Sequence, residues 1–440
     1  MKGLTETIRE YRDFFQERDY PLVERNNFQT PKSSNATFTF CSGMFYEDFY
    51  EGSQRAMPDK EIIHQYAIRT DSFYKIGDSP KHLLFFNMLG LFEFNQPNRY
   101  SNLENILEFL TNSIDASKIS LNVPQKIESD KNFRDIINQK GLGYEVYLDD
   151  NLLWTTSLNS PYNGLRIEIN YKDENSLVEL WNIGYIENKG NLIAIDSGIC
   201  AERLNMAQNG LSNVYEIEDF VKIKNLITGL PRINKNYFLY SREVNTNPID
   251  SSNKELNLIA DLYRTTRTLL ESGVNPTGKK DRKGMHLRNF LKKQFAFMYI
   301  NGFDLESVTE LYPQHARIIQ EEVKLFNSNM RLESIDTKMT EIQETLQFSH
   351  PFKGDKFFRN RSKKLSSDEL KTYRQEIHRK LSLDDLSAID LAPFEVLFDW
   401  AVTNELLDDK RVRVSDKEEL KILCNQYKTN LLLFKRGGLL

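Results

Sequence analysis

Residues 65–94 read QYAIRTDSFYKIGDSPKHLLFFNMLGLFEF, and the fold is organised around this stretch. The run from residue 65 to residue 70 mixes apolar and polar residues over a strand-like length, which predicts a short strand. The loop formers that follow are Gly77, Asp78, Ser79 and Pro80. Residues 83–94 are rich in Phe, Leu and Met, which predicts a second strand that is well buried. The stretch therefore predicts a strand, a loop and a returning strand.

The charged and aromatic residues of this hairpin suit a nucleotide. Arg69 ends the first strand, Lys75 lies in the loop, and Phe86 begins the second strand. A guanidinium group presents a planar fork that matches phosphate oxygens, and a Phe ring offers a face on which a base can stack. A solvated hairpin with a hydrophobic return strand explains the same residues, and this stretch alone does not decide between the two.

Composition limits the class of protein. The chain has 440 residues with a net charge of −5, so contact with a nucleic acid would have to come from local basic patches. Its three cysteines, Cys41, Cys200 and Cys424, lie far apart, which argues against a disulfide framework and against a cysteine-based zinc site. The N-terminus has no apolar signal core, and no run of residues is long and apolar enough for a membrane span. We expect a soluble cytoplasmic protein that contacts no membrane and holds no zinc.

The two halves of the chain differ in the spacing of their apolar residues. Residues 165–171, LRIEINY, alternate strictly and predict a strand, and residues 178–186 and 191–195 predict two more. After residue 230 the apolar residues recur at helical spacing, first over residues 253–272. We therefore expect an α+β domain over residues 1–230, a linker over residues 231–252, and a mostly helical domain over residues 253–440.

Several segments, in this order, resemble the alanyl-tRNA synthetase family of class II synthetases. They are FTFCSGMFYEDFYEG, the hairpin IRTD…KHLLFFNMLGLFEF, DDNLLW, RIEINYKD, ELWNIGYIE and AIDSGICAERL, followed by IADLYRTTRTLLESGVNP and FEVLFDW. Each segment is weakly specific by itself, but the shared order along nearly the whole chain is specific.

The resemblance implies a fold and a reaction. The fold would be the antiparallel class II sheet flanked by helices, followed by a helical domain that recognises tRNA. The reaction would use ATP and Mg²⁺ to convert a small amino acid, alanine or a similar one, into an aminoacyl-adenylate, which is then transferred to the 3′ end of a tRNA at its acceptor stem. Such a reaction depends on orientation and charge rather than on a catalytic triad.

The resemblance also assigns residues to an ATP site. Arg69 would bind the α-phosphate and Arg203 the γ-phosphate, and both would be catalytic. The remaining ATP-site residues would be His82, Phe86, Met88 and Glu168. Glu168 would also hold Mg²⁺. Core packing is the alternative for Phe86 and Met88, and a solvated strand face is the alternative for Glu168.

A second set of residues would bind the amino acid. It consists of Trp154, Asn182, Gly184, Asp196 and Gly198. Asp196, at the end of a strand, would receive the substrate ammonium group. Its alternative role is the N-cap of the helix that begins near Cys200, and the alternative for Trp154 is a core aromatic.

Basic residues of the second half are candidates for RNA contact. They are Lys279, Lys280, Arg282, Lys283 and Arg288. A solvated face is the ordinary explanation of such a run. Asp399, in FEVLFDW, matches the position at which the family uses an aspartate to read the acceptor stem.

The sequence departs from the family in ways that keep other functions open. We find no counterpart of the editing and C-terminal RNA-binding domains, and the loop over residues 275–284 is longer and carries Gly278 where the family has an asparagine that reads the stem. Gly184 stands where the family has a β-branched residue, which could enlarge the amino-acid pocket, and Cys200 replaces a glycine. The alternatives are a paralogue that loads its amino acid onto an unusual tRNA, a carrier or a small molecule, and a non-catalytic RNA-binding or regulatory protein. We expect a monomer.

Overall fold

The computed structural model describes residues 1–26, 28–31, 36–50, 56–70, 73–95, 97–148, 153–154, 162–173, 176–232, 253–276, 281–301 and 303–332. Its strands are β1 (Leu22–Arg25), β2 (Lys60–Ile68), β3 (Phe85–Phe94), β4 (Ile119–Pro124), β5 (Gly143–Tyr147), β6 (Leu153–Trp154), β7 (Asn163–Asp173), β8 (Ser176–Asn188) and β9 (Asn191–Cys200). Its α-helices are α1 (Leu4–Gln16), α2 (Glu47–Tyr50), α3 (Arg99–Thr111), α4 (Gln125–Glu128), α5 (Lys131–Lys140), α6 (Ala201–Gln208), α7 (Glu218–Thr228), α8 (Lys254–Glu271), α9 (Arg282–Ile300) and α10 (Ala316–Leu332). Short 3₁₀ turns include η1 (Ser42–Tyr46), η2 (Phe73–Lys75) and η7 (Leu305–Leu311).

A single mixed sheet forms the first half of the molecule. Its strand order is β1-β2-β3-β9-β8-β7-β4-β5, and β6 pairs with β7 outside this path. The pairs β1–β2 and β4–β5 are parallel, and the pairs between β2 and β4 in this order are antiparallel. The α+β prediction is therefore confirmed, with the difference that the two outer strands run parallel to their neighbours.

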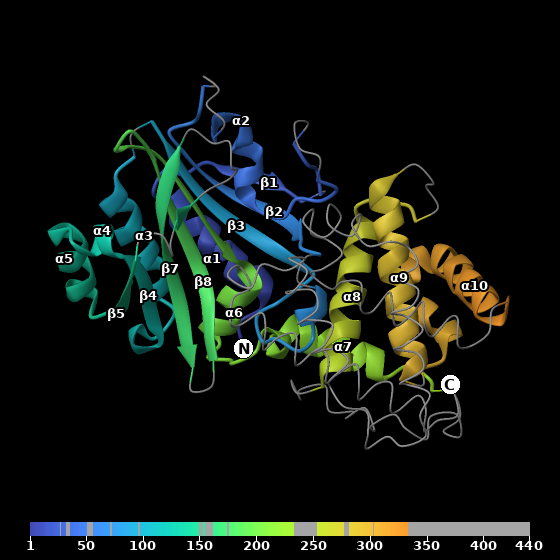
Figure 1. Cartoon of the computed structure of the whole chain (residues 1–440). Helices are drawn as coiled ribbons and strands as arrows, with labels where there is room; N and C mark the ends of the chain where they lie inside the picture. Colours follow the sequence, from blue (N-terminus) through green and yellow to red (C-terminus); the bar gives the residue numbers. More distant parts are fainter. Residues whose placement is uncertain are drawn as a thin grey trace, which may run out of the picture.

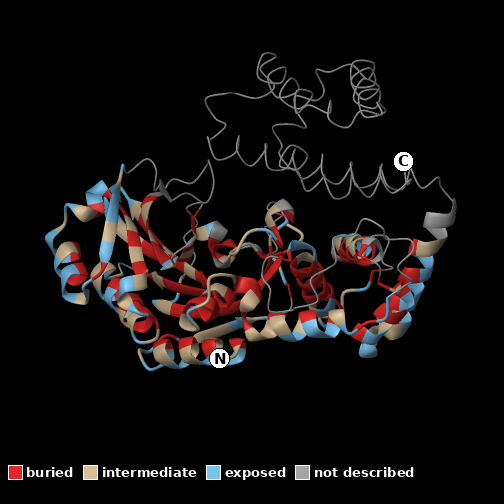
Figure 2. Cartoon of the chain, turned by 90° about the horizontal axis from the view of Figure 1, so that it is seen from below, coloured by how far each residue is buried: buried red, intermediate tan, exposed pale blue. Residues whose placement is uncertain are grey.

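Helices cover one face of the sheet. Tyr11 and Phe15 of α1 and Phe109 of α3 surround Trp181 of β8, with ring centroids 5.9–6.1 Å from its own. These side chains are buried, and Figure 2 shows buried residues running along the sheet and the inner helix faces. Burying these aromatic rings makes a large favourable contribution to the stability of this half.

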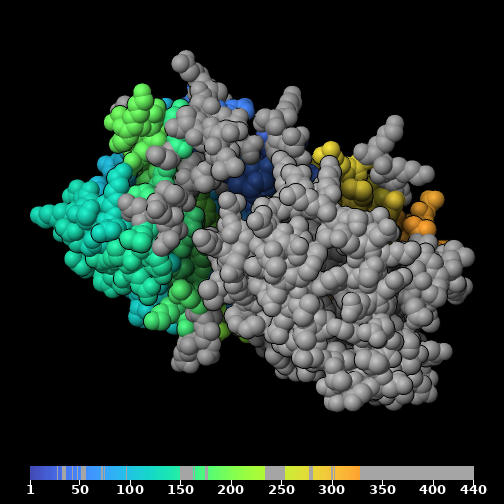
Figure 3. Space-filling model, in the orientation of Figure 1, coloured from blue at the N-terminus to red at the C-terminus, as the bar shows by residue number. Residues whose placement is uncertain are grey.

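The helices α8, α9 and α10 form a second group beside the sheet (Figure 1). Asn253 caps α8, because its side chain accepts a hydrogen bond from the Leu256 amide. Helix α8 packs against α9 and α7. Figure 3 shows the α4–β5 region and the α9–α10 region at opposite ends of the molecule. None of the helices in the described ranges is long and apolar enough to cross a bilayer.

The hairpin predicted over residues 65–94 is present, with shifted limits. Its first strand, β2, begins at Lys60, five residues before the predicted start. Its second strand, β3, begins at Phe85 rather than at residue 83. The limits of the two domains and the linker remain predictions, because residues 233–252 and 333–440 lie outside the described residues.

Candidate active site

The register of the sheet brings most of the predicted site residues onto one face. Side chains of directly paired residues lie on the same face of a sheet, and so do those two positions apart on one strand. One row across the strands is Phe92, Asp196, Gly184 and Arg166. The next row on the same face is Gly90, Gly198, Asn182 and Glu168. The face opposite to these rows is the one that packs on α1 and α3.

Phe86 and Met88 continue this face along β3 toward the loop. Phe86 is paired with Ala67, and Met88 with Gln65 and Cys200. Gly90 and Gly198 are paired at the centre, so neither places a side chain over the sheet there. The face therefore runs from an aromatic end at Phe86, over a floor of two glycines, to a carboxylate at Asp196. Trp154 pairs with Gly164 on the neighbouring β6–β7 edge, but its side chain lies outside the described part of the structure.

Cations gather at the aromatic end. Arg69 follows β2, and its guanidinium carbon lies 5.2 Å from the centroid of the Phe86 ring. Its Nε donates a hydrogen bond to the carbonyl oxygen of Phe40 at 3.0 Å. Arg203, in the first turn of α6, donates from Nε to the carbonyl oxygen of Lys81 at 2.9 Å. The hairpin loop is thereby held against α6.

His82 lies among several positively charged side chains. Burial is the largest cause that lowers the pKa of His82, and together with the positive charges of Arg203, Lys75, Lys81 and Arg69 it brings this pKa to about 3. The ring is therefore neutral at pH 7, and its Nδ1 lies 2.6 Å from Ser79 Oγ. Burial also lowers the pKa of Lys81, with Arg203 as the next cause. Four cations converging on one neutral ring make an electropositive site that suits a polyphosphate.

The opposite end of the face carries a carboxylate in a constrained position. Tyr50 of α2 donates a hydrogen bond from its hydroxyl to Asp196 Oδ2 at 3.0 Å. Burial raises the pKa of Asp196 to about 7, against the lowering effect of that hydrogen bond. A Cβ atom added at Gly43 would lie 2.6 Å from Asp196 Oδ2, so only glycine leaves the carboxylate in place. An ammonium group would fit beside this carboxylate and stabilise its ionised form.

The position of Asp196 corrects the sequence analysis. The prediction placed it at the end of a strand, with a helix N-cap as the alternative. It lies within β9, which extends to Cys200, and Cys200 is the N-cap of α6. The N-cap alternative is therefore wrong, and the Asp196 side chain is free to face the site.

Glu168 has partners of its own. Arg166 Nη2 lies 2.9 Å from Glu168 Oε1, and Asn122 Nδ2 donates to Oε2 at 3.1 Å. Glu168 and Glu179 both raise the pKa of Lys81, so two carboxylates lie near the cation cluster. Mg²⁺ bound to phosphates needs only one or two protein carboxylates, and Glu168 would be the carboxylate that holds it. Within the described ranges, no group of three or more His, Cys, Asp or Glu side chains forms a closed metal cage.

The described basic residues of α9 are partly engaged within the chain. Lys283 Nζ donates to the Phe28 carbonyl oxygen at 2.7 Å, and Arg288 Nε lies 3.5 Å from the carboxylate of buried Glu322. Arg282 is exposed at the start of α9. Lys279, Lys280, Gly278 and Asp399 lie outside the described residues, so their predicted roles stay predictions.

Sequence analysis missed three contributors to this site. Gly43 and Tyr50 lie in segments that carried the family resemblance, but nothing in the pattern indicated that both approach Asp196. Lys81 directly precedes His82, which the family resemblance assigned to the ATP site, and this adjacency was the available signal.

No protein-family model matches the chain. Its sequence is 23% identical over 385 residues to an alanine–tRNA ligase of Buchnera aphidicola subsp. Schizaphis graminum, covering 77% of this chain and 42% of that protein. It is 24% identical over 353 residues to an alanine–tRNA ligase of Salinispora tropica, covering 70% of this chain and 38% of that protein. The chain contains a divergent class II synthetase-like region.

Two facts define the extent of this synthetase-like similarity. The chain spans about two fifths of the length of these relatives, 42% and 38%. A solved aspartyl-tRNA synthetase from Entamoeba histolytica superposes with a TM-score of 0.33 at 12% sequence identity, covering 49% of this chain and 56% of that one.

Proposed function

We propose that this chain uses ATP and Mg²⁺ to activate a small amino acid, alanine or a similar one, and transfers it to the 3′ end of a tRNA. The observation that carries the proposal is the shared sheet face. It carries the Phe86 ring and four cations at one end, two glycines in the middle and the Asp196 carboxylate at the other end.

In the proposed reaction, a carboxylate oxygen of the amino acid attacks the α-phosphorus of ATP, and the bond to the β-phosphate breaks to release pyrophosphate. Arg69 neutralises charge at the α-phosphate and Arg203 at the γ-phosphate. Mg²⁺, when bound near Glu168, supplies further positive charge to the phosphates. A hydroxyl group at the RNA 3′ end then attacks the acyl carbon, and AMP leaves.

Orientation along the sheet face supports this assignment. Phe86 and Asp196 are six residues apart in the register of β3, since Phe92 pairs with Asp196. At about 3.4 Å per residue this separates the two ends by roughly 20 Å. An aminoacyl-adenylate carries a base at one end and an ammonium group at the other, in the same order as the Phe86 ring and the Asp196 carboxylate along this face.

A second candidate function is amino-acid activation with transfer to an acceptor other than an ordinary tRNA. The observation that favours it is the engagement of Lys283 and Arg288 in contacts within the chain, which leaves fewer described cations for RNA phosphates. Both candidates share the first step and differ only in the acceptor.

Amino-acid-dependent exchange between pyrophosphate and ATP tests the first step, and charging of total tRNA tests the second. Exchange together with charging supports the first proposal. Exchange without labelled RNA favours the second. The absence of exchange with every amino acid would contradict both and favour a non-catalytic protein.

A further inference from the structure

Helix α8 contacts the ATP end of the site through buried polar groups. Asp261 and Arg264 are one turn apart on this helix, and both are buried although the helix belongs to the second half of the chain. Burial of charged groups is costly unless each of them has partners. Their partners are the strand and the helix that carry Phe86 and Arg203.

Asp261 is bonded to the backbone that precedes β3. Its Oδ2 accepts a hydrogen bond from the Leu84 amide at 2.8 Å. The Leu84 carbonyl oxygen in turn accepts a hydrogen bond from the Arg69 amide at 3.0 Å. Leu84 therefore links helix α8 to the backbone of Arg69, the arginine proposed to face the α-phosphate.

Arg264 is bonded to both ATP-site elements. Its Nη1 donates to the Phe85 carbonyl oxygen at 2.8 Å, directly before Phe86. Its other terminal nitrogen forms an ion pair with Glu202, the neighbour of Arg203 in α6. Glu202 also accepts hydrogen bonds from the Asn87 amide at 3.0 Å and from Cys200 Sγ at 3.2 Å. The start of β3 and the start of α6 are thus joined through one buried guanidinium group.

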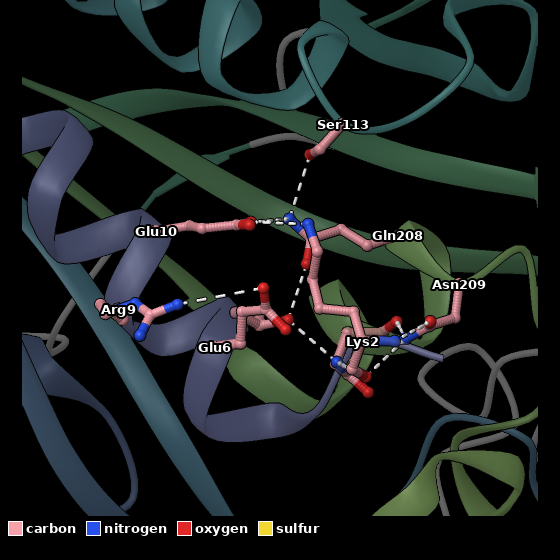
Figure 4. Close-up of polar contacts among 9 residues, drawn as sticks. Lys2, Glu6, Arg9, Glu10, Ser113, Gln208 and Asn209 are labelled. Atoms are coloured by element: carbon pink, nitrogen blue, oxygen red, sulfur yellow. Dashed lines mark hydrogen bonds and ion pairs between the residues drawn. The ribbon is translucent and has the colours of Figure 1, made fainter.

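The other end of α6 is held separately, by the N-terminal segment. Gln208 donates to Ser113 Oγ and to Glu10, and Asn209 bonds to the backbone of Lys2 (Figure 4). These contacts lie at the far end of α6 from Arg203. The first turn of α6 is held by the Glu202–Arg264 pair together with the hydrogen bonds of Arg203 to the carbonyl oxygens of Lys81 and Glu179.

We propose that Asp261 and Arg264 are positioning residues that set the geometry of Phe86, Arg69 and Arg203 for ATP, and that they leave the amino-acid end of the site unaffected. This inference rests on the proposed function. The Asp196 carboxylate is approached by Tyr50 and Gly43, whereas Asp261 and Arg264 bond to Leu84, Phe85 and Glu202, so different residues hold the two ends. A buried ion pair contributes little net stability compared with apolar packing, which agrees with a role in geometry.

The test compares the apparent KM for ATP with that for the amino acid in the exchange reaction of the full chain. Asp261→Leu removes the acceptor of the Leu84 amide at similar volume. Asp261→Asn keeps a carbonyl acceptor and serves as the conservative rescue. Arg264→Met removes the ion pair. Lys254→Met is the matched control. Lys254 lies on α8 as well, and it forms an exposed ion pair with Asp78 in the loop between β2 and β3.

We expect Asp261→Leu and Arg264→Met to raise the KM for ATP by roughly tenfold or more, with the KM for the amino acid unchanged. The KM for ATP should stay close to the wild-type value in Asp261→Asn and should equal it in Lys254→Met. Equal changes in both constants, or a loss that follows the folded fraction in circular dichroism, would show that the two residues are only structural and would overturn the inference.

Direct ATP binding, measured by calorimetry, separates this inference from the proposed function. If the wild type shows no exchange but binds ATP, the proposed function fails. Weaker ATP binding by Asp261→Leu than by Lys254→Met then still supports the positioning role, whereas equal binding overturns it. A wild type that shows neither exchange nor ATP binding overturns both.

Discussion

The two ends of the candidate site are built differently. At the ATP end, Phe86 is buried, and the backbone on both sides of it is bonded to buried charged groups of α8 and α6. At the amino-acid end, Asn182 is half-buried, and the described hydrogen bond that holds the Asp196 carboxylate is the one from Tyr50. The difference teaches that the end proposed to bind ATP is fixed by the fold, whereas the end proposed to bind the amino acid is shaped by a few side chains.

The largest expected effect comes from breaking the ATP end. Arg203→Ala or Arg69→Ala should lower the rate of pyrophosphate–ATP exchange by roughly 10²–10³-fold or more, because each removes a fixed positive charge from the reacting phosphates. Arg267→Ala is a suitable control, since Arg267 forms an exposed ion pair within α8. Wild-type exchange in both site variants would mean that the nucleotide does not bind at this end.

Breaking the amino-acid end should have a smaller and more selective effect. Asp196→Asn should raise the KM for the amino acid on the order of 10²-fold, because the substrate ammonium loses its charged partner. The KM for ATP should stay unchanged. A parallel rise in both constants would show that the two ends are not independent.

The pH dependence follows from the same carboxylate. Because burial raises the pKa of Asp196 to about 7, the side chain becomes ionised as the pH rises through 7. Amino-acid affinity should therefore increase between pH 6 and pH 8 in the wild type, and this increase should be absent in Asp196→Asn.

The free energy of unfolding of the wild type should fall over the pH range in which amino-acid affinity rises. A carboxyl group whose pKa is raised in the folded protein contributes stability at low pH that is lost as the pH rises toward 7. Asp196→Asn should therefore gain stability relative to the wild type as the pH is raised from 4 to 8. Urea unfolding at several pH values measures this difference, and a constant difference would contradict the raised pKa.

Gly43→Ala tests the close approach to Asp196. The added Cβ would lie 2.6 Å from Asp196 Oδ2, so the carboxylate must move. We expect a rise of about tenfold in the KM for the amino acid, with the KM for ATP retained. Gly143→Ala is the matched control, since a Cβ atom there meets nothing within 4 Å. Gly141→Ala is unsuitable, because Gly141 has a φ of 65°. An unchanged KM in Gly43→Ala would place the ammonium group elsewhere.

The smallest expected effect is on substrate size. Gly184 pairs with Asp196 on the site face, so Gly184→Val should reduce exchange with amino acids larger than alanine by a few-fold, an effect of about 1 kcal/mol. Ile183→Val is the control, since Ile183 is the neighbouring residue on the opposite, buried face. An equal effect on all amino acids would show that Gly184 does not bound the side chain of the substrate.

The strands of the site could be predicted from sequence, but the position of Asp196 could not. The patterns of residues 165–171 and 178–186 predicted two strands, which β7 and β8 confirm, whereas the shared face of Glu168, Asn182 and Gly184 follows only from the register. Asp196 was misplaced because Asp-Ser-Gly is a turn-forming sequence. Pairing of β9 with strands on both sides overrides this local preference, and Ser197 Oγ donates a hydrogen bond to the Leu91 carbonyl oxygen across the sheet.

The buried charges of α8 were beyond the reach of sequence patterns. Residues 253–272 predicted an amphipathic helix, and Asp261 and Arg264 fell between the apolar positions, where a solvent-facing polar side is expected. They are buried because their partners lie in Leu84, Phe85 and Glu202, which are more than 60 residues away in sequence. Helical periodicity carries no information on such distant partners.

The most direct test of the central claim is amino-acid-dependent exchange of pyrophosphate into ATP by the full chain, measured with each of the twenty amino acids. The account predicts exchange, with alanine the best substrate or close to the best. No exchange with any amino acid, from protein shown to be folded, would contradict it.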